Sequence, residues 1–171
     1  MKKIEIKRAK PMDIPVIESI LLDTVNWLND INQQLWREED VKWDALAKSY
    51  QIEDFYIVFL NSEPAGCMVL LDYDPFFWPN VAKGEALFIH KLAITKLARK
   101  SGVADALINF AKDEGIKQHA SSIRLDCNQY REKLRAFYER HSFVCVDEKI
   151  INEKWHVAFY VYMLTGGSRA Y

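Results

Sequence analysis

Residues 86–94 read ALFIHKLAI, an almost unbroken apolar run that leads through a basic turn straight into an amphipathic helix. An apolar run of this length is typical of a strand that is covered on both faces of a sheet. In the helix, apolar residues recur at i, i+3, i+4, i+7 and i+8 from Val103 to Ala111. A buried strand that passes directly into such a helix predicts an α/β domain.

The rest of the chain predicts the elements that complete this domain. Its 171 residues suit a single domain, 1–171, with one mixed sheet of about seven strands and about four helices. The last seven residues, TGGSRAY, are expected to form a tail. The predicted strands are 4–9, 55–60, 67–73, 86–94, 122–127, 143–151 and 155–164, and the predicted helices are 11–29, 37–50, one that starts at Val103 and one around 134–141.

Composition excludes several classes of protein. The formal net charge of -1 lacks the basic excess of a nucleic-acid binder, and no apolar run approaches the ~20 residues that span a membrane. The first ten residues contain no apolar signal-peptide core. The three cysteines, Cys67, Cys127 and Cys145, are far apart, and the chain contains no CxxC or HExxH motif. We therefore expect a reduced, cytoplasmic protein with no metal site and no disulfide framework.

The turn after strand 86–94 combines a glycine with three cations, Lys96, Arg99 and Lys100. Gly102 allows close approach of a ligand to the backbone, and the N-terminus of the next helix offers N–H groups and a positive dipole end. This pattern predicts a site for a phosphate or pyrophosphate. The alternative is an ordinary turn with exposed cations, and neither a GK[ST] nor a GxGxxG motif is present.

The wider context of this turn resembles a known family. The turn reads R-x-x-G-x-A from Arg99, it follows a strand that ends HKLAI, and a later helix contains LRAFYERHSF. The first helix is preceded by R-A-x-x-x-D from Arg8. In this order the motifs, which span Ile4 to about Leu164, resemble the GNAT superfamily of N-acetyltransferases. The resemblance implies the GNAT-like form of the α/β (α+β) fold, in which a central pair of strands splays apart.

Two positions depart from the family pattern. Arg131 stands where the late helix of the family usually has an asparagine, although Asn128 lies just upstream. Ser142 replaces the glycine that usually provides a left-handed end to this helix, so it should either cost about 1 kcal/mol or be capped differently.

The resemblance implies transfer of an acetyl group from acetyl-CoA to an amine. The cofactor pyrophosphate would bind the turn, the pantetheine arm would pair with the end of strand 86–94, and the N–H of Leu92 would stabilise the developing oxyanion. Whether Arg131 replaces an amide contact to the cofactor is left open. The expected cofactor-binding residues are Leu92, Ala93, Ile94, Arg99, Lys100, Ser101, Gly102, Val103, Ala104, Asn128 and Arg131.

Two residues are predicted to move protons. Tyr138 matches the tyrosine of the family that acts as the acid for the leaving thiolate, and its alternative role is that of a core aromatic residue. His90 lies on strand 86–94 and would act as the base or as part of a water relay, with Glu85 as another candidate and simple hydrogen bonding as the alternative. Cys127 is interpreted as a core residue because no base adjoins it in sequence.

The acceptor amine, of a small molecule or a peptide, is expected to bind Trp36, Asp74 and Trp78, because aromatic rings with carboxylates suit a cation. A tryptophan-rich lid over the core is the alternative interpretation. A homodimer through the final hairpin is also compatible with the sequence. A second hypothesis for the whole chain is a non-catalytic acyl-CoA-binding sensor or interaction module on the same fold.

Overall fold

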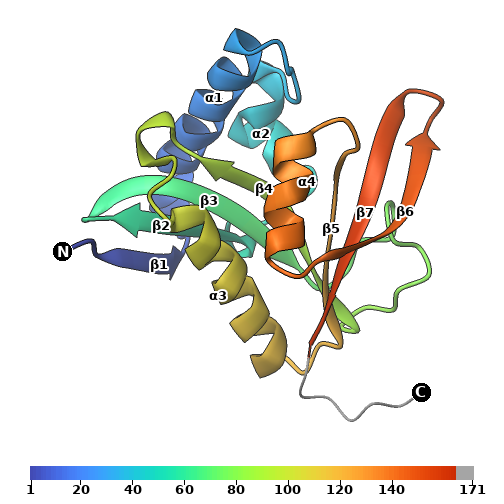
Figure 1. The fold of residues 1–171 in the computed structure, drawn as a ribbon. Coiled ribbons are helices and arrows are strands. Elements are labelled where there is room, and N and C mark those ends of the chain that lie inside the picture. Colours follow the sequence, from blue (N-terminus) through green and yellow to red (C-terminus); the bar gives the residue numbers. More distant parts are fainter. Residues whose placement is uncertain (165–171) are drawn as a thin grey trace. The chain divides into compact units, whose positions relative to one another are not determined.

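The computed structural model describes residues 1–164, and the predicted tail at 165–171 lies outside the described residues. It contains a seven-stranded sheet with the strand order β1-β2-β3-β4-β5-β7-β6 (Figure 1). Strands β4 and β5 are parallel, and the pairs β1–β2, β2–β3, β5–β7 and β6–β7 are antiparallel, which confirms the predicted mixed sheet. The elements are β1 (Ile4–Arg8), α1 (Ile14–Asp30), α2 (Trp43–Leu46), β2 (Phe55–Leu60), β3 (Glu63–Leu71), β4 (Ala86–Ile94), α3 (Val103–Lys117), β5 (Ser122–Asn128), α4 (Glu132–Arg140), β6 (Val144–Ile151) and β7 (Trp155–Met163).

The chain folds into two compact units. Unit 1 comprises Met1–Leu70 and His90–Phe110, and unit 2 comprises Leu71–Ile89 and the residues from Ala111 onward. Strand β4 and helix α3 each contribute residues to both units. The two units are therefore interleaved along the sequence, and a division into two consecutive segments does not describe this chain.

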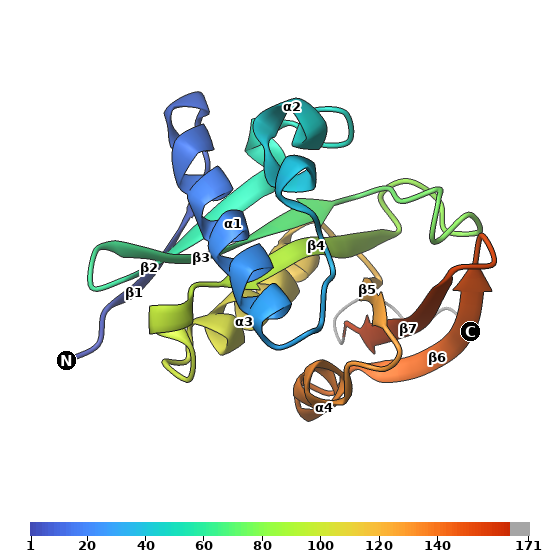
Figure 2. The same ribbon diagram turned by 90° about the horizontal axis from the view of Figure 1, so that it is seen from above.

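In unit 1, helix α1 lies across one face of β1, β2 and β3 (Figure 2). Its buried residues recur at helical spacing, as the sequence predicts. The alternation along β2 sends neighbouring side chains to opposite faces. Phe55 packs on Trp43 and Tyr50, and the next residue, Tyr56, packs on Phe110 of α3 with ring centroids 4.9 Å apart. Both faces of the sheet in this unit thus carry aromatic contacts.

The predicted continuous helix at 37–50 is wrong. The segment forms a 3-10 turn at Glu38–Val41 and then the four-residue helix α2. Lys42 between them has an extended backbone, and the N–H of Trp43 donates to the Glu18 carboxylate of α1 at 2.9 Å. A side chain from a distant helix therefore caps α2 and separates the two turns, and sequence spacing alone does not reveal that contact.

The turn between β2 and β3 is shorter than the predicted turn at 61–66. Asn61 and Ser62 both have positive φ, 51° and 71°, and β3 starts at Glu63 rather than at Cys67. Two left-handed residues in a row form a tight hairpin turn whose twist matches that of the flanking strands. This geometry leaves Pro64 inside the strand, opposite Phe59, beside a bulge.

In unit 2, β7 lies between β5 and β6, and all three strands are antiparallel to their neighbours in this group (Figure 1). Seven buried hydrophobic residues form a core cluster that includes Trp78, Phe88 and Phe159. The rings of Trp78 and Phe159 meet edge to face, with centroids 5.2 Å apart. The segment at 71–81 therefore supplies core aromatic residues to this unit.

The ladder between β4 and β5 is short. Only Ala86–Phe88 pairs with Ser122–Arg124, although β4 is a nine-residue strand and β5 has seven residues. Within residues 1–164, no helix is long and apolar enough to cross a membrane.

Candidate functional site

The segment of β4 in unit 1 is distorted at Lys91. This residue lies in the middle of the strand yet has a φ of 51°, a left-handed conformation that costs a non-glycine residue about 1–2 kcal/mol. Its carbonyl oxygen accepts a hydrogen bond from Cys67 Sγ at 3.7 Å. Backbone strain of this kind is retained where function requires it. The irregularity immediately precedes the predicted cofactor residues Leu92, Ala93 and Ile94.

His90 has a partner that sequence analysis did not identify. The hydroxyl of Tyr50 lies 3.3 Å from Nδ1 of His90, and the two ring centroids are 5.9 Å apart. Tyr50 is itself fixed by an edge-to-face contact with Phe55. The Tyr50 hydroxyl can donate to Nδ1 or accept from it, so this contact fixes the orientation of the imidazole ring and is compatible with either tautomer.

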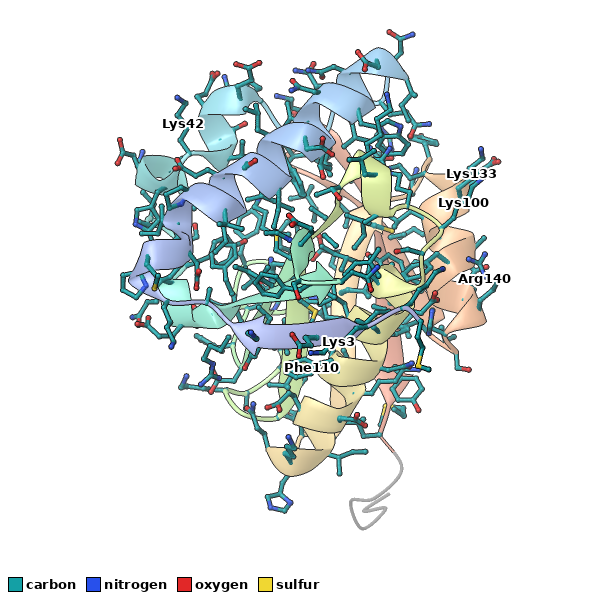
Figure 3. All side chains as sticks on the ribbon, turned by 90° about the vertical axis from the view of Figure 1, so that its left-hand side faces the viewer. Lys3, Lys42, Lys100, Phe110, Lys133 and Arg140 are labelled. Carbon is teal, nitrogen blue, oxygen red and sulfur yellow. The ribbon has the colours of Figure 1, made fainter. Side chains whose placement is uncertain are left out.

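The turn that follows β4 contains two left-handed residues and leads directly into α3. Lys100 and Gly102 have positive φ values of 61° and 93°. The Ser101 hydroxyl donates to the carbonyl of Ala98, and the N–H of Ala106 donates to the carbonyl of Gly102 at 3.0 Å, which begins α3. The N–H groups before Ala106 belong to the first turn of the helix, where the α-helical pattern provides no acceptor. Lys100 is exposed on this turn (Figure 3).

The space beside Gly102 is open. A Cβ added at Gly102 would meet no atom of residues 1–164 within 4 Å, its two chain neighbours excepted. Two of the three predicted cations of the turn, Lys96 and Lys100, are exposed, and Arg99 is half-buried. A carboxylate, Asp105, also lies in the first turn of α3 and is exposed. The Asp23 carboxylate accepts the backbone N–H of Lys96 at the start of the turn, and the three cations still outnumber these two acids.

Trp36, predicted to bind the acceptor, already faces a cation. The ammonium group of Lys91 lies 4.6 Å from the centroid of the Trp36 ring. Close by, hydrogen bonds from Arg37 hold the pKa of the Asp40 carboxyl below its usual value, and the charge of Lys91 adds to this effect. A cationic amine would therefore bind this face of Trp36 only by displacing Lys91.

Tyr138 in unit 2 is a buried phenol on α4. Its ring lies among those of Phe137, Phe143 and Tyr160, with centroid distances of 5.5, 6.0 and 6.1 Å. Burial raises the pKa of Tyr138 well above its usual value, with a further contribution from the Cys127 thiol. The phenol therefore keeps its proton throughout the neutral range, but the raised pKa lies further from the operating pH at which a general acid works best.

Arg131 precedes α4 and is partly buried. Burial lowers the pKa of its guanidinium, while Tyr138 and Cys127 act in the opposite direction. Its Nε is buried and has no hydrogen-bond partner among residues 1–164. A buried donor that lacks an acceptor is costly unless a ligand supplies one. Arg131 thus has one donor available for such a ligand.

Asn128, Cys127 and Glu85 have structural partners. The Asn128 side-chain oxygen accepts the N–H of Tyr130 at 2.9 Å, a turn that leads the chain from β5 towards α4. Burial raises the pKa of the Cys127 thiol to about 12, so it is not a thiolate nucleophile near neutrality. Glu85 is exposed and accepts the N–H of Ala82 at 3.1 Å.

Asp74 and Trp78, also predicted to bind the acceptor, lie together in the loop after β3. Oδ1 of Asp74 accepts the N–H of Phe77 at 3.2 Å, and its carbonyl accepts the N–H of Trp78 at 2.9 Å. Both residues are buried, and Trp78 belongs to the core cluster of unit 2. These contacts give both residues a role in the fold, and their role in binding an acceptor stays a prediction.

A family model agrees with this geometry. The model of the acetyltransferase (GNAT) family matches residues 21–143. A curated relative from Bacillus subtilis (strain 168), the uncharacterized N-acetyltransferase YesJ, is 24% identical over 144 residues, which are 77% of this chain and 76% of that protein.

Solved structures share the fold. An acetyltransferase of the GNAT family from Listeria monocytogenes superimposes with a TM-score of 0.76 at 23% identity, covering 94% of this chain and 95% of that one. The N-acetylglutamate synthase from Neisseria gonorrhoeae, in complex with coenzyme A and N-acetylglutamate, superimposes with a TM-score of 0.68 at 17% identity. That match covers 96% of this chain and 36% of the synthase. The predicted fold class is therefore confirmed.

Proposed function

We propose that this chain, which belongs to the acetyltransferase (GNAT) family, transfers an acetyl group from acetyl-CoA to a primary amine of a small molecule or peptide. The observation that carries the proposal is the turn in front of α3. It combines left-handed Lys100 and Gly102, exposed cations and open space above the glycine. The resemblance to the GNAT superfamily, which implies acetyl-CoA as co-substrate, depends on this same turn.

The residues present suit an anionic co-substrate. The first N–H groups of α3 and the side chain of Arg99 would bind the pyrophosphate, since helix N-termini and guanidinium groups both favour phosphate oxygens. Leu92, Ala93 and Ile94 would pair with the amide groups of the pantetheine arm. Arg131, whose buried Nε lacks an acceptor, would donate to a carbonyl or phosphate oxygen of the same molecule. The CoA complex of the structurally similar synthase supports the choice of cofactor.

In the proposed reaction the amine attacks the thioester directly, and three groups of the chain assist. His90, directly or through water, takes the proton that the ammonium group of the acceptor must lose before attack. The N–H of Leu92 donates to the developing oxyanion, and the left-handed residue before it interrupts the regular amide pattern of β4. Tyr138 donates its proton to the departing thiolate.

The acceptor is proposed to be an amine that is a cation in solution. Trp36 offers an aromatic face beside the acids at 38–40, and Asp74 and Trp78 are the remaining candidates. In this proposal the acceptor replaces Lys91 on the Trp36 ring, which exchanges one cation–π contact for another.

A non-catalytic acyl-CoA sensor is the second candidate. It is favoured by Arg131, which stands at a position where the family usually has asparagine, and by Lys91, which occupies the ring predicted to bind the acceptor. A sensor needs the anion turn but has no requirement for the hydroxyl of Tyr138 or the imidazole of His90.

Release of free CoA thiol from acetyl-CoA, measured against a panel of small and peptide amines, separates these candidates. The enzyme releases thiol in proportion to one class of amine, and the acetylated amine is identified by mass. Cofactor binding by calorimetry in the absence of turnover with any amine would support the sensor. Absence of CoA binding would refute both.

A further inference from the structure

Helix α1 contacts the turn before α3 through two residues spaced four apart. Asp23 and Trp27 lie at i and i+4, so they share one face of α1. Neither belongs to a motif that indicates cofactor binding. Both meet the turn that is proposed to hold the pyrophosphate, within the same compact unit.

The two contacts hold the turn at two points. At its start, the Asp23 carboxylate accepts the backbone N–H of Lys96 at 2.7 Å, across 73 residues of sequence. Further along the turn, before the left-handed Lys100 and Gly102, the guanidinium carbon of Arg99 lies only 3.4 Å from the centroid of the Trp27 ring. At this distance the guanidinium lies against the indole, and both side chains are half-buried.

We infer that Trp27 is a positioning residue for the cofactor, which holds the Arg99 guanidinium ready to bind phosphate oxygens while Asp23 fixes the start of the same turn. This inference rests on the proposed function. The N–H donors of arginine lie around the edge of a plane, so stacking one face on an indole leaves the donor edge directed sideways. A stacked arginine has also lost most of its rotamer freedom before the anion arrives, which lowers the entropic cost of binding.

Coupling between Trp27 and Arg99 is the property that distinguishes this role from simple packing. If Trp27 acts through Arg99, its removal should weaken CoA binding only while Arg99 is present. If Trp27 merely supports α1, its removal should weaken binding by the same factor with or without Arg99. A double-mutant cycle measures this difference directly.

The test is calorimetric titration of CoA into the wild type, Trp27→Leu, Arg99→Ala and the double variant, with thermal melting to establish that each is folded. We expect Trp27→Leu to raise the Kd about 3- to 30-fold and to have no further effect in the Arg99→Ala background. Trp27→Phe keeps an aromatic face and should have an intermediate effect. This variant provides the same test if Trp27→Leu does not fold. Trp43→Leu is the matched control, because Trp43 is another half-buried indole of the same unit that packs on Phe55.

Equal effects of Trp27→Leu in both backgrounds, or no effect in either, would overturn the inference and leave the proposed function standing. A wild-type protein that binds no CoA would refute the proposed function, and the positioning role would fail with it. A loss of affinity in Trp43→Leu equal to that in Trp27→Leu would show that the effect is not specific to the Arg99 stack.

Discussion

Tyr138 is a buried tyrosine of α4, and its burial raises the pKa of its hydroxyl. Tyr138→Phe keeps the ring contacts with Phe137, Phe143 and Tyr160 and removes only the hydroxyl. Loss of a general acid typically lowers kcat about 10²–10⁴-fold, and the Kd for CoA should stay near the wild-type value. Steady-state kinetics with the best amine of the panel, together with calorimetry, measure both quantities.

Tyr56→Phe is the matched control for this variant. Tyr56 is 5% exposed, as Tyr138 is, and its hydroxyl accepts a hydrogen bond from Arg8 at 2.7 Å. Tyr56 has no role in the proposed reaction, so the Tyr56→Phe variant should keep the kcat of the wild type. Full kcat in Tyr138→Phe would make Tyr138 a core residue and leave protonation of the thiolate to water.

Gly102 supports a second prediction about a single residue. Gly102→Glu places a carboxylate where the pyrophosphate is proposed to bind, so CoA binding should be lost in calorimetric titration. Any side chain here is also strained, because φ is 93°. Gly84→Glu separates the two causes, since Gly84 has a φ of 82° and equally open surroundings but lies outside the turn. Unchanged affinity in Gly102→Glu, or equal loss in both variants, contradicts the proposed position of the anion.

At the scale of whole elements, α3 and α4 end in the same way. In α4 the N–H of Phe143 donates to the carbonyl of Tyr138 and that of Ser142 to Glu139. In α3 the N–H of Ala120 donates to Gly115 and that of His119 to Ile116. These are Schellman motifs, and their left-handed positions are occupied by Ser142 and His119, with φ of 67° and 58°. The left-handed stop expected at Ser142 is therefore confirmed.

Ser142→Gly and His119→Gly should each stabilise the protein by about 0.5–1 kcal/mol, because glycine adopts the left-handed conformation without steric cost. Urea unfolding measures the free energy of unfolding. The control is Ala136→Gly on the exposed face of α4, which should destabilise by about 1 kcal/mol because glycine is a poor helix former. A destabilised Ser142→Gly would show that the serine side chain makes a compensating contribution.

Periodicity predicted most elements of this chain because their patterns are local. The bounds of β2 and β4 match the predicted ranges, and α1 ends one residue after the predicted end. The segment at 37–50 could not be predicted in the same way, since the cap that shapes it comes from Glu18, 25 residues away from Trp43. The left-handed conformation of Lys91 has no sequence signal, because lysine is not a residue that favours positive φ.

For the whole molecule, the motifs identify the family but not the contacts that orient the site residues. Gly102, Arg99 and Tyr138 can be recognised because each belongs to a motif with fixed spacing. Tyr50 and Trp27 cannot, because each meets its partner only after distant segments come together. The hydroxyl of Tyr50 reaches His90 across 40 residues of sequence. Contacts of this kind require a structure, since an aromatic residue at helical spacing is interpreted first as a core residue.

Stability at alkaline pH is a property of the whole fold and follows from its buried acids. Burial raises the pKa of Cys67 and Cys127 from 9.0 to about 12, and it also raises that of Tyr138 from 10.0. Above the pKa that each group has in the unfolded chain, 9.0 for the thiols and 10.0 for the phenol, the unfolded chain loses these protons while the folded chain keeps them. The folded state is therefore disfavoured as pH rises. The free energy of unfolding should be insensitive to these groups below about pH 8, and it should fall by about 1.4 kcal/mol per pH unit for each group once the pH exceeds the value of that group in the unfolded chain.

Urea unfolding under reducing conditions tests this prediction at about pH 7.5, 9 and 10.5. These values lie below, at and above the thiol pKa of the unfolded chain. Cys67→Ala and Cys127→Ala lower the stability at every pH, because each removes a buried sulfur, but each should also make the alkaline slope shallower by one group. The slope is the informative quantity, since it reports the number of protons released on unfolding rather than packing. If both variants keep the wild-type slope, the two thiols ionise equally in the folded and unfolded states, and their burial does not control the alkaline limit of this fold.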